Sequence, residues 1–169
     1  LNHHPVYCPN RIVNSILGVK GSLYRQKNIA FSFDCRLPEP LSLSGVTLCS
    51  LFTNVLDNAY HAVQSGVPEL RRIDLSAYLV NGFLLLTCQN PIPPGFQPKL
   101  ERRRKAEDGT QHGLGLLILQ TIAEQHKGTM EIQTANDIFQ IRLLLQLPAP
   151  STSPVPASIL PQKEEATPV

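Results

Sequence analysis

The chain has 169 residues, of which 42% are hydrophobic and 17% charged, a composition typical of one globular domain with a buried core. Its formal net charge of +2 is too small to indicate nucleic-acid binding, and no run approaches the ~18 apolar residues of a membrane span. The four cysteines have no CxxC spacing and no paired histidines, so neither a zinc site nor a redox motif is indicated. Three of them, Cys35, Cys49 and Cys88, lie in or beside apolar segments and are expected to be buried, reduced thiols.

Composition divides the chain into three parts. Residues 1–9 hold two prolines and no periodicity, and we interpret them as a linker from a missing upstream dimerisation or sensor region. Residues 10–148 carry the periodic patterns and form the expected domain. Pro, Ser, Ala and Glu dominate residues 149–169, which predicts a disordered tail.

The first half of the domain predicts a helix, a strand and a second helix. Asn10 is expected to cap the first helix. Apolar residues of this helix recur with i, i+3, i+4 spacing at Ile12, Val13, Ile16, Leu17, Leu23 and Tyr24. Alternation over residues 29–33 predicts a short strand, and Pro38 and Pro40 precede the second helix, roughly residues 44–64.

The second helix has two different faces. Its buried stripe is predicted to consist of Leu48, Leu51, Phe52, Val55, Leu56, Ala59, Ala62 and Val63. Asn54, Asp57, Asn58 and His61 stand at i, i+3, i+4 and i+7, so these four polar side chains share another face. Any one of them alone is more simply explained as a solvated residue, but together they are spaced to meet a metal ion and a nucleotide.

A β-hairpin and a long loop follow. Alternating apolar residues over 73–79, the turn Asn81-Gly82 and the apolar run 83–88 predict a tight hairpin. Residues 89–111 then hold four prolines, two glycines and no apolar period, which is typical of a functional loop. Its basic run, residues 102–105, is more often a solvated charge cluster than a phosphate contact.

The glycine pair in His112-Gly113-Leu114-Gly115-Leu116-Leu117 opens a third predicted helix. Glycines allow the backbone to approach a ligand closely, and the unpaired N–H groups of a helix start favour an anion, so this stretch predicts a phosphate site. The helix is expected to bury Leu114, Leu117, Ile118 and Ile122 on one side and to end near Lys127 with a C-terminal glycine, Gly128.

A last hairpin completes the domain. Met130, Ile132 and Thr134 predict one strand, Asn136-Asp137 a turn, and the apolar alternation over residues 139–147 the final strand. Helices mixed with antiparallel hairpins in this order indicate an α+β fold, a two-layer α/β sandwich. We therefore expect a mixed, mostly antiparallel sheet covered on one face by three helices.

These motifs resemble the GHKL family of ATP-binding domains, the Bergerat-fold group that contains gyrase and sensor histidine kinases. Asn54 to Ala62 resembles the family's N-box, and the stretch from His112 to Leu117 resembles its glycine-rich G2 box. The likeness covers about residues 10–147. Within the family it is strongest to the catalytic domains of peptide-sensing histidine kinases of the accessory-gene-regulator type.

The resemblance implies ATP and Mg²⁺ as ligands and a set of residues that hold them. Asn58 and Asn54 would be the metal ligands, since amide oxygens suit this hard cation. His61 falls where many sensor kinases place a basic residue near the phosphates, so Asn54, Asn58 and His61 are the candidate catalytic residues. The phosphates would lie against the G2 box, His112, Gly113, Leu114, Gly115 and Leu116.

Two departures from the wider family bear on the chemistry. Hydrolysing members carry a glutamate general base where this chain has Asn54, whose amide cannot accept a proton, so the resemblance favours transfer to a supplied acceptor over attack by water. Many members bind adenine through the aspartate of Asp-x-Gly-x-Gly, whereas this chain has Asn90 followed by prolines. The carbonyl oxygen of Asn90 can accept from adenine in its place.

The resemblance also implies partners and a location. The acceptor would be a histidine on the protein's own dimerisation domain, outside this sequence, in a homodimer that passes the phosphoryl group to a response regulator in a two-component system. The chain would then be the cytoplasmic domain of a bacterial inner-membrane protein, attached through missing upstream segments. The alternatives are a serine kinase of the anti-sigma-factor type and a nucleotide-free pseudo-kinase that serves as an interaction module.

Overall fold

The computed structural model describes residues 6–95 and 114–148, which form three α-helices, a short 3₁₀ turn and five strands. In chain order these are α1 (Arg11–Gln26), β1 (Ala30–Arg36), α2 (Gly45–Gln64), the 3₁₀ turn Pro68–Leu70, β2 (Arg72–Val80), β3 (Phe83–Pro91), α3 (Leu114–Gln125), β4 (Thr129–Ala135) and β5 (Ile138–Gln146). The predicted order of elements is confirmed, and only the 3₁₀ turn was missed. None of the described helices is long and apolar enough to span a membrane.

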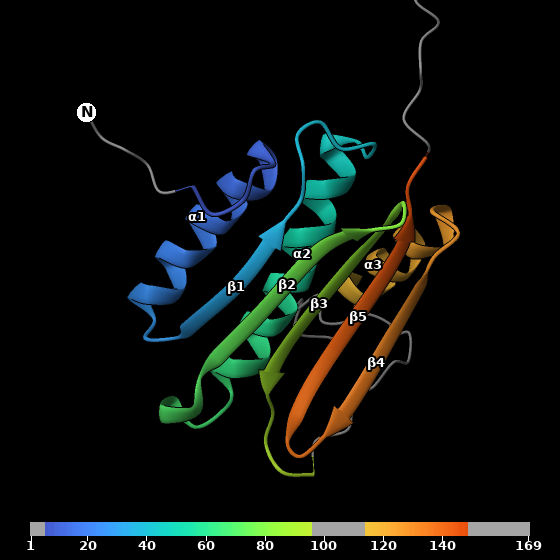
Figure 1. The fold of residues 1–169 in the computed structure, drawn as a ribbon. Helices are drawn as coiled ribbons and strands as arrows, with labels where there is room; N and C mark the ends of the chain where they lie inside the picture. The colour runs from blue at the N-terminus through green and yellow to red at the C-terminus, as the bar shows by residue number, and fades with distance from the viewer. Residues whose placement is uncertain (1–5, 96–113, 149–169) are drawn as a thin grey trace, which may run out of the picture.

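The strands form one mixed sheet in the order β1-β2-β3-β5-β4. Strand β1 pairs in parallel with β2, and the other three pairs are antiparallel. All three helices lie behind the sheet in Figure 1, which leaves its front face uncovered. The predicted two-layer α+β fold is therefore confirmed.

Alternation along the strands separates a core face from an outer face. Buried residues of the two central strands recur at every second position, for example Leu84, Leu86 and Cys88 on β3 and Ile141 and Leu143 on β5. These side chains pack against the helices and form the core. Both hairpin turns were placed correctly, since Asn81, Gly82, Asn136 and Asp137 all have positive φ angles, as tight turns of this kind require.

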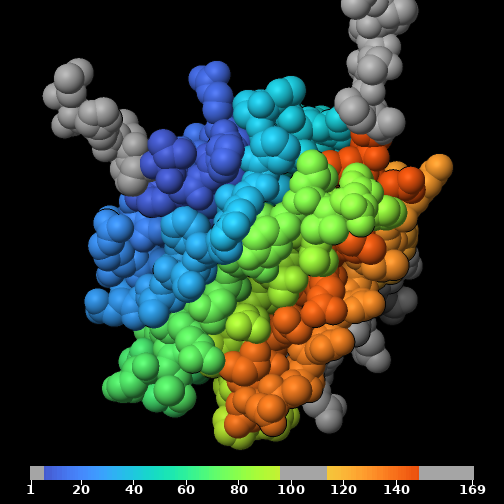
Figure 2. Space-filling model, in the orientation of Figure 1, coloured from blue at the N-terminus to red at the C-terminus, as the bar shows by residue number. Residues whose placement is uncertain are grey.

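Figure 2 shows the outer face of the sheet, to which β1 and β2 contribute polar side chains such as Ser32, Asp34 and Ser76. On it the hydroxyl of Tyr78 donates to Asp34 Oδ2 at 2.8 Å, and Arg36 Nε donates to Asp34 Oδ1 at 2.9 Å. These two hydrogen bonds lower the pKa of Asp34 below its usual value, and the bond from Arg36 has the larger effect. A network of this kind is stable in water, which explains why this face needs no helix layer.

The chain approaches α1 through a packed segment. Asn10 caps the helix as predicted, its side chain accepting from the N–H of Val13 at 3.2 Å. Asn14 Oδ1 accepts from the N–H groups of Tyr7 and Cys8, and Cys8 is buried. Within the linker predicted for residues 1–9, Tyr7 and Cys8 thus lie against the domain.

The buried side of α3 differs in part from the prediction. Ile122 is buried and Ile118 packs against the core, as expected, but Leu114 and Leu117 are exposed. Leu119 and Ala123 are buried instead. The first turns of this helix are apolar nearly all round, so periodicity alone could not fix the buried face. Contact with α2 fixes it instead, because Gly115 and Leu119 lie one turn apart on the side that packs inward.

The glycine that follows α3 has a different role from the one expected. The residue with the left-handed backbone is Lys127, with φ of 47°, and not the predicted glycine. Gly128 is needed because a Cβ there would overlap the backbone carbonyl of Leu144 on β5. Close approach of two backbones, rather than conformational freedom, explains this glycine.

Cysteine reactivity provides a test of the fold. Cys8, Cys35 and Cys88 are buried, whereas Cys49 is exposed, contrary to the prediction, because it lies beside Leu48 but outside the buried stripe of α2. Burial raises the pKa of Cys35 and of Cys88 to about 12, so both stay protonated at pH 8. We expect a disulfide reagent to modify one thiol per native chain rapidly and all four after denaturation.

The variant Cys49→Ser identifies the reactive thiol. It should remove the rapid phase of labelling, as followed by absorbance, and leave the slow phase unchanged. Two or more rapidly reacting thiols in the native protein would contradict the packing described for the core.

Candidate functional site

The candidate site is built on α2, whose apolar stripe faces the core. Ser44 caps the helix by accepting from the N–H of Thr47 at 3.1 Å, and the helix then continues to Gln64. The buried residues are Leu48, Leu51, Phe52, Val55, Leu56, Ala59 and Val63. This packing turns the predicted polar face outward, where Asn54, Asp57 and Asn58 are half-buried and His61 is exposed.

The start of α3 lies directly against two of these residues. A Cβ added to Gly115 would lie 3.0 Å from Asn58 Oδ1 and 3.2 Å from Asn54 Oδ1. The two predicted motifs, which are about 60 positions apart in the chain, are therefore in contact. Only glycine leaves the asparagine amides their present space beneath the helix start.

The amide of Asn54 has a defined orientation. Its Nδ2 donates to the backbone carbonyl of Ser50 at 2.7 Å, one turn earlier on α2, and lies 3.3 Å from the Ser50 hydroxyl. Because the NH₂ group is held by the helix, the Oδ1 atom is the one presented toward Gly115. Asn54 therefore offers an oxygen ligand to this space.

Asn58 has a buried donor that is not satisfied by the described residues. Its Nδ2 is inaccessible to solvent and has no hydrogen-bond partner in residues 6–95 and 114–148. A buried donor without a partner costs about 1–3 kcal/mol, and such a group is often a ligand contact. An amide in this position can give its oxygen to a cation and its NH₂ group to a phosphate oxygen.

The remaining residues of the polar face have other neighbours. Asp57 forms an ion pair with Lys20 of α1, with Nζ and Oδ1 2.5 Å apart. The ring of His61 lies edge-on to that of Tyr60, with centroids 5.6 Å apart. His61 is at the same face as the asparagines, one turn beyond Asn58.

Asn90 lies at the end of β3, on the side that faces the helices. It is 2% exposed, and its Nδ2 donates to the carbonyl of Pro91 at 2.9 Å. The Oδ1 atom is thus left as the acceptor, as the proposed contact with an adenine amino group requires. A buried polar residue in a strand of otherwise apolar core positions is the clearest sign of function on this strand.

Several predicted residues lie outside the described residues. These are His112, Gly113 and the basic run 102–105. Of the described part of the G2 box, Gly115 and Leu116 are half-buried and Leu114 is exposed. The roles of Asn54, Asn58, His61, Asn90 and this box in ligand binding remain predictions.

Sequence analysis missed Ser50 and the partner of Asp57. Ser50 could have been found by extending the polar face of α2 back by one turn from Asn54. The pairing of Lys20 with Asp57 joins two helices, and no periodicity within one element indicates it.

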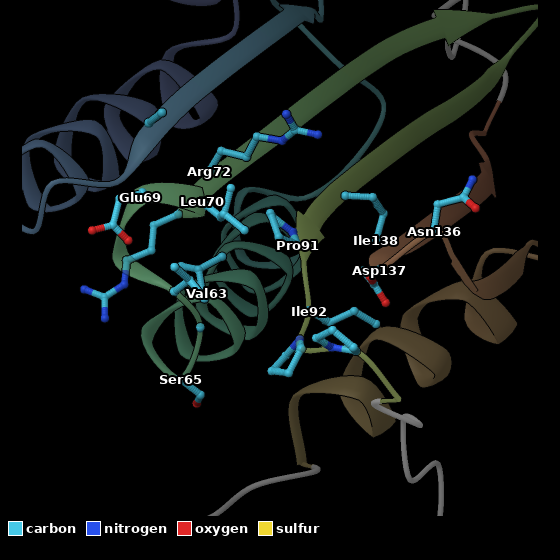
Figure 3. A pocket seen from close by; sticks show the side chains of 16 residues that line it. Val63, Ser65, Glu69, Leu70, Arg72, Pro91, Ile92, Asn136, Asp137 and Ile138 are labelled. Atoms are coloured by element: carbon cyan, nitrogen blue, oxygen red, sulfur yellow. The ribbon is translucent and has the colours of Figure 1, made fainter.

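A hollow of about 500 Å³ lies at the end of the sheet (Figure 3). Val63, Pro91, Ile92 and Ile138 contribute to its mainly apolar lining, and none of the predicted site residues does.

The structure describes no cluster of three or more His, Cys, Asp or Glu side chains that could hold a metal ion. A divalent ion at the site would therefore be held by the two amide oxygens, by water and by oxygens of its ligand.

Fold and site together define a two-layer α+β domain in which paired amides of one helix meet the glycine that opens another. The sequence model of the GHKL domain family matches residues 43–146, well over half of the chain, so the chain belongs to this family. No curated protein matches the chain by sequence.

Solved histidine kinases have a similar fold. The catalytic domain of histidine kinase ThkA is similar with a TM-score of 0.62 and 17% identity, over 82% of this chain and 91% of that one. The Acinetobacter baumannii histidine kinase AdeS is similar with a TM-score of 0.56 and 16% identity, over 80% of this chain and 63% of that one. At these identities the likeness shows a shared fold.

Replacing the glycine that opens α3 tests the site. In Gly115→Ala the added Cβ would lie 3.0 Å from Asn58 Oδ1, closer than an ordinary contact, so the amides must shift. Alanine favours a helix over glycine by up to ~1 kcal/mol, so the protein should stay folded. We expect nucleotide affinity, measured with a fluorescent ATP analogue, to fall about tenfold.

Gly21→Ala is the matched control. Gly21 also lies in a helix, but its added Cβ would meet only Phe31, at 3.8 Å, which is an ordinary contact. Equal affinities for the Gly115→Ala variant and the wild type would show that the space beneath Gly115 does not hold a ligand.

Proposed function

We propose that this chain is the ATP-binding catalytic domain of a sensor histidine kinase. It would transfer the γ-phosphoryl group of ATP to a histidine on a dimerisation helix outside this sequence. The observation that carries the proposal is the contact of Gly115 with Asn54 and Asn58, because it joins a helix start suited to phosphate with two oxygen ligands suited to a cation.

The residues present fit a nucleotide with Mg²⁺. Asn54 Oδ1 is oriented toward the space by the bond of Nδ2 to Ser50, and Asn58 holds a donor without a described partner. Asn54 and Asn58 would hold the ion, and the N–H groups that open α3 would donate to the phosphate oxygens. When bound, Mg²⁺ neutralises charge on the phosphate oxygens.

The role of each side chain in the reaction follows from its chemistry. In the transfer, the bond from the γ-phosphorus to the ADP oxygen breaks as a bond to the histidine nitrogen forms. Asn58 and the α3 start hold the phosphates in place, and His61 adds a donor or a positive charge at the same face. Asn54 has no basic group at the position where hydrolysing members of the family carry their glutamate general base, which favours the histidine acceptor.

The proposal extends to the type of kinase, its partners and its location. The motif Asn-Val-Leu-Asp-Asn-Ala at residues 54–59 and Asn90 in place of aspartate favour the accessory-gene-regulator type of kinase. The partners would be the protein's own dimerisation domain and a response regulator, in a two-component system. The domain would be cytoplasmic and joined to a bacterial inner membrane through upstream segments.

Nucleotide binding should depend on Mg²⁺ and on Asn58. Asn58→Ala removes both the oxygen ligand and the buried donor, so we expect the affinity for ATP with Mg²⁺ to fall by about 100-fold. The control Gln133→Ala, an exposed amide on β4, should bind as the wild type does. Absence of wild-type binding at millimolar ATP would instead support the nucleotide-free interaction module.

The chemistry of the phosphorylated product separates the two kinase hypotheses. With a dimerisation domain that carries a helical histidine, added in trans, we expect an acid-labile phosphoryl label on that histidine. An acid-stable label on serine would contradict the proposal and favour the serine kinase of the anti-sigma-factor type.

Asn90 should determine the choice of base. Adenine offers an amino group to the Asn90 oxygen, whereas guanine presents a carbonyl there, so Asn90→Ala should lower the preference for ATP over GTP about tenfold. Asn90→Asp keeps an acceptor oxygen and is expected to retain the preference. Competition binding with the two nucleotides measures it, and an unchanged preference in Asn90→Ala would show that adenine lies elsewhere.

A further inference from the structure

Two polar contacts join α1 to the middle of α2. Lys20 Nζ lies 2.5 Å from Asp57 Oδ1, and the hydroxyl of Tyr24 donates to the backbone carbonyl of Leu56 at 3.0 Å. Lys20 and Tyr24 are four residues apart, so they project from one face of α1. Leu56 and Asp57 are adjacent on α2, so both contacts hold the same turn of that helix.

Tyr24 is fixed in its place. It is fully buried, its ring stacks on Tyr60 with centroids 5.7 Å apart, and the edge contact to Phe31 of β1 has centroids 5.0 Å apart. Burial, with a smaller contribution from the charge of Asp57, raises the pKa of Tyr24, so its hydroxyl remains a donor at all ordinary pH values. The bond to Leu56 is therefore not lost by ionisation of the Tyr24 hydroxyl.

Lys20 is largely shielded from solvent. Its side chain is 15% exposed, whereas that of Asp57 is 45% exposed. A lysine in this position keeps its charge compensated only while Asp57 stays near it. The ion pair thus joins the middle of α2 directly to α1.

The turn of α2 that Lys20 and Tyr24 contact also carries the two candidate metal ligands. Asn54 and Asn58 lie on either side of Leu56 and Asp57 in the sequence, one helical turn apart. A rotation of α2 would move both amides together relative to Gly115. Close packing of the apolar α2 stripe opposes such a rotation, and the hydrogen bond and the ion pair add directional contacts to it.

We propose that Lys20 and Tyr24 of α1 are positioning residues that hold Asn54 and Asn58 in the geometry required to bind a divalent cation. This inference rests on the proposed function of the site. Both residues contact α2 itself, and they would act through the backbone of Leu56 and the carboxylate of Asp57. Their loss should therefore affect the contribution of Mg²⁺ to binding more than nucleotide binding itself.

The experiment compares nucleotide affinity with Mg²⁺ and with a chelator. We measure binding of a fluorescent ADP analogue to the folded chain and take the ratio of the two affinities. Lys20→Met and Tyr24→Phe are expected to lower this ratio about tenfold, as loss of residues that orient metal ligands commonly does. Tyr24→Phe keeps the ring and its contacts, so it tests the hydroxyl even if Lys20→Met impairs folding.

Matched controls separate positioning from general effects. Lys27→Met removes an exposed lysine just beyond the same helix, and Tyr60→Phe removes a hydroxyl that bonds to Gln64. Both should keep the wild-type ratio, and Lys20→Arg should keep most of it because the charge is retained. Thermal melts confirm that each variant is folded at the measuring temperature.

The outcomes distinguish the two proposals. A wild type that binds nucleotide with Mg²⁺, together with unchanged ratios in Lys20→Met and Tyr24→Phe, would overturn only the positioning role. Equal losses of affinity with Mg²⁺ and with the chelator would also overturn it, because they indicate a general structural effect. A wild type without Mg²⁺-dependent binding would overturn the proposed function and this inference together.

Discussion

The candidate site depends on the contact of one glycine with two asparagine amides. Gly115 opens α3, and a side chain there would press on Asn54 and Asn58 of α2. Two features of the helix layer produce this contact. The apolar stripe of α2 faces the core and so turns the amides outward, and the buried side of α3 brings Gly115 over them. The contact places the Oδ1 atoms of Asn54 and Asn58 beneath the start of α3.

The sheet positions the second part of the site. Asn90 is a buried polar residue at the end of β3, between core residues of the same strand and the helix layer. Its amide donates to Pro91, so the acceptor oxygen is left for a ligand. A rigid strand end and a capped helix thus supply the two sets of polar groups, which limits how far either can move relative to the other.

Features that depend on local chemistry could be predicted from the sequence. The two tight turns, the caps of α1 and α2 and the shared face of Asn54 and Asn58 all follow from residue type and helical or strand period. Features that depend on tertiary contact could not. The buried side of α3 is set by α2, the need for Gly128 by the approach of β5, and the partner of Asp57 by α1.

The first helix has a consequence for how this domain can be produced. A fragment that begins at α2 would retain Asn54, Asn58, Asn90 and Gly115, so a search for motifs alone would not reveal that anything is missing. It would lack α1 and β1, however, and thereby expose the apolar side of α2 and leave β2 as an unprotected sheet edge. Expression boundaries should therefore be drawn before Tyr7, where the backbone is first anchored to the folded body by Asn14.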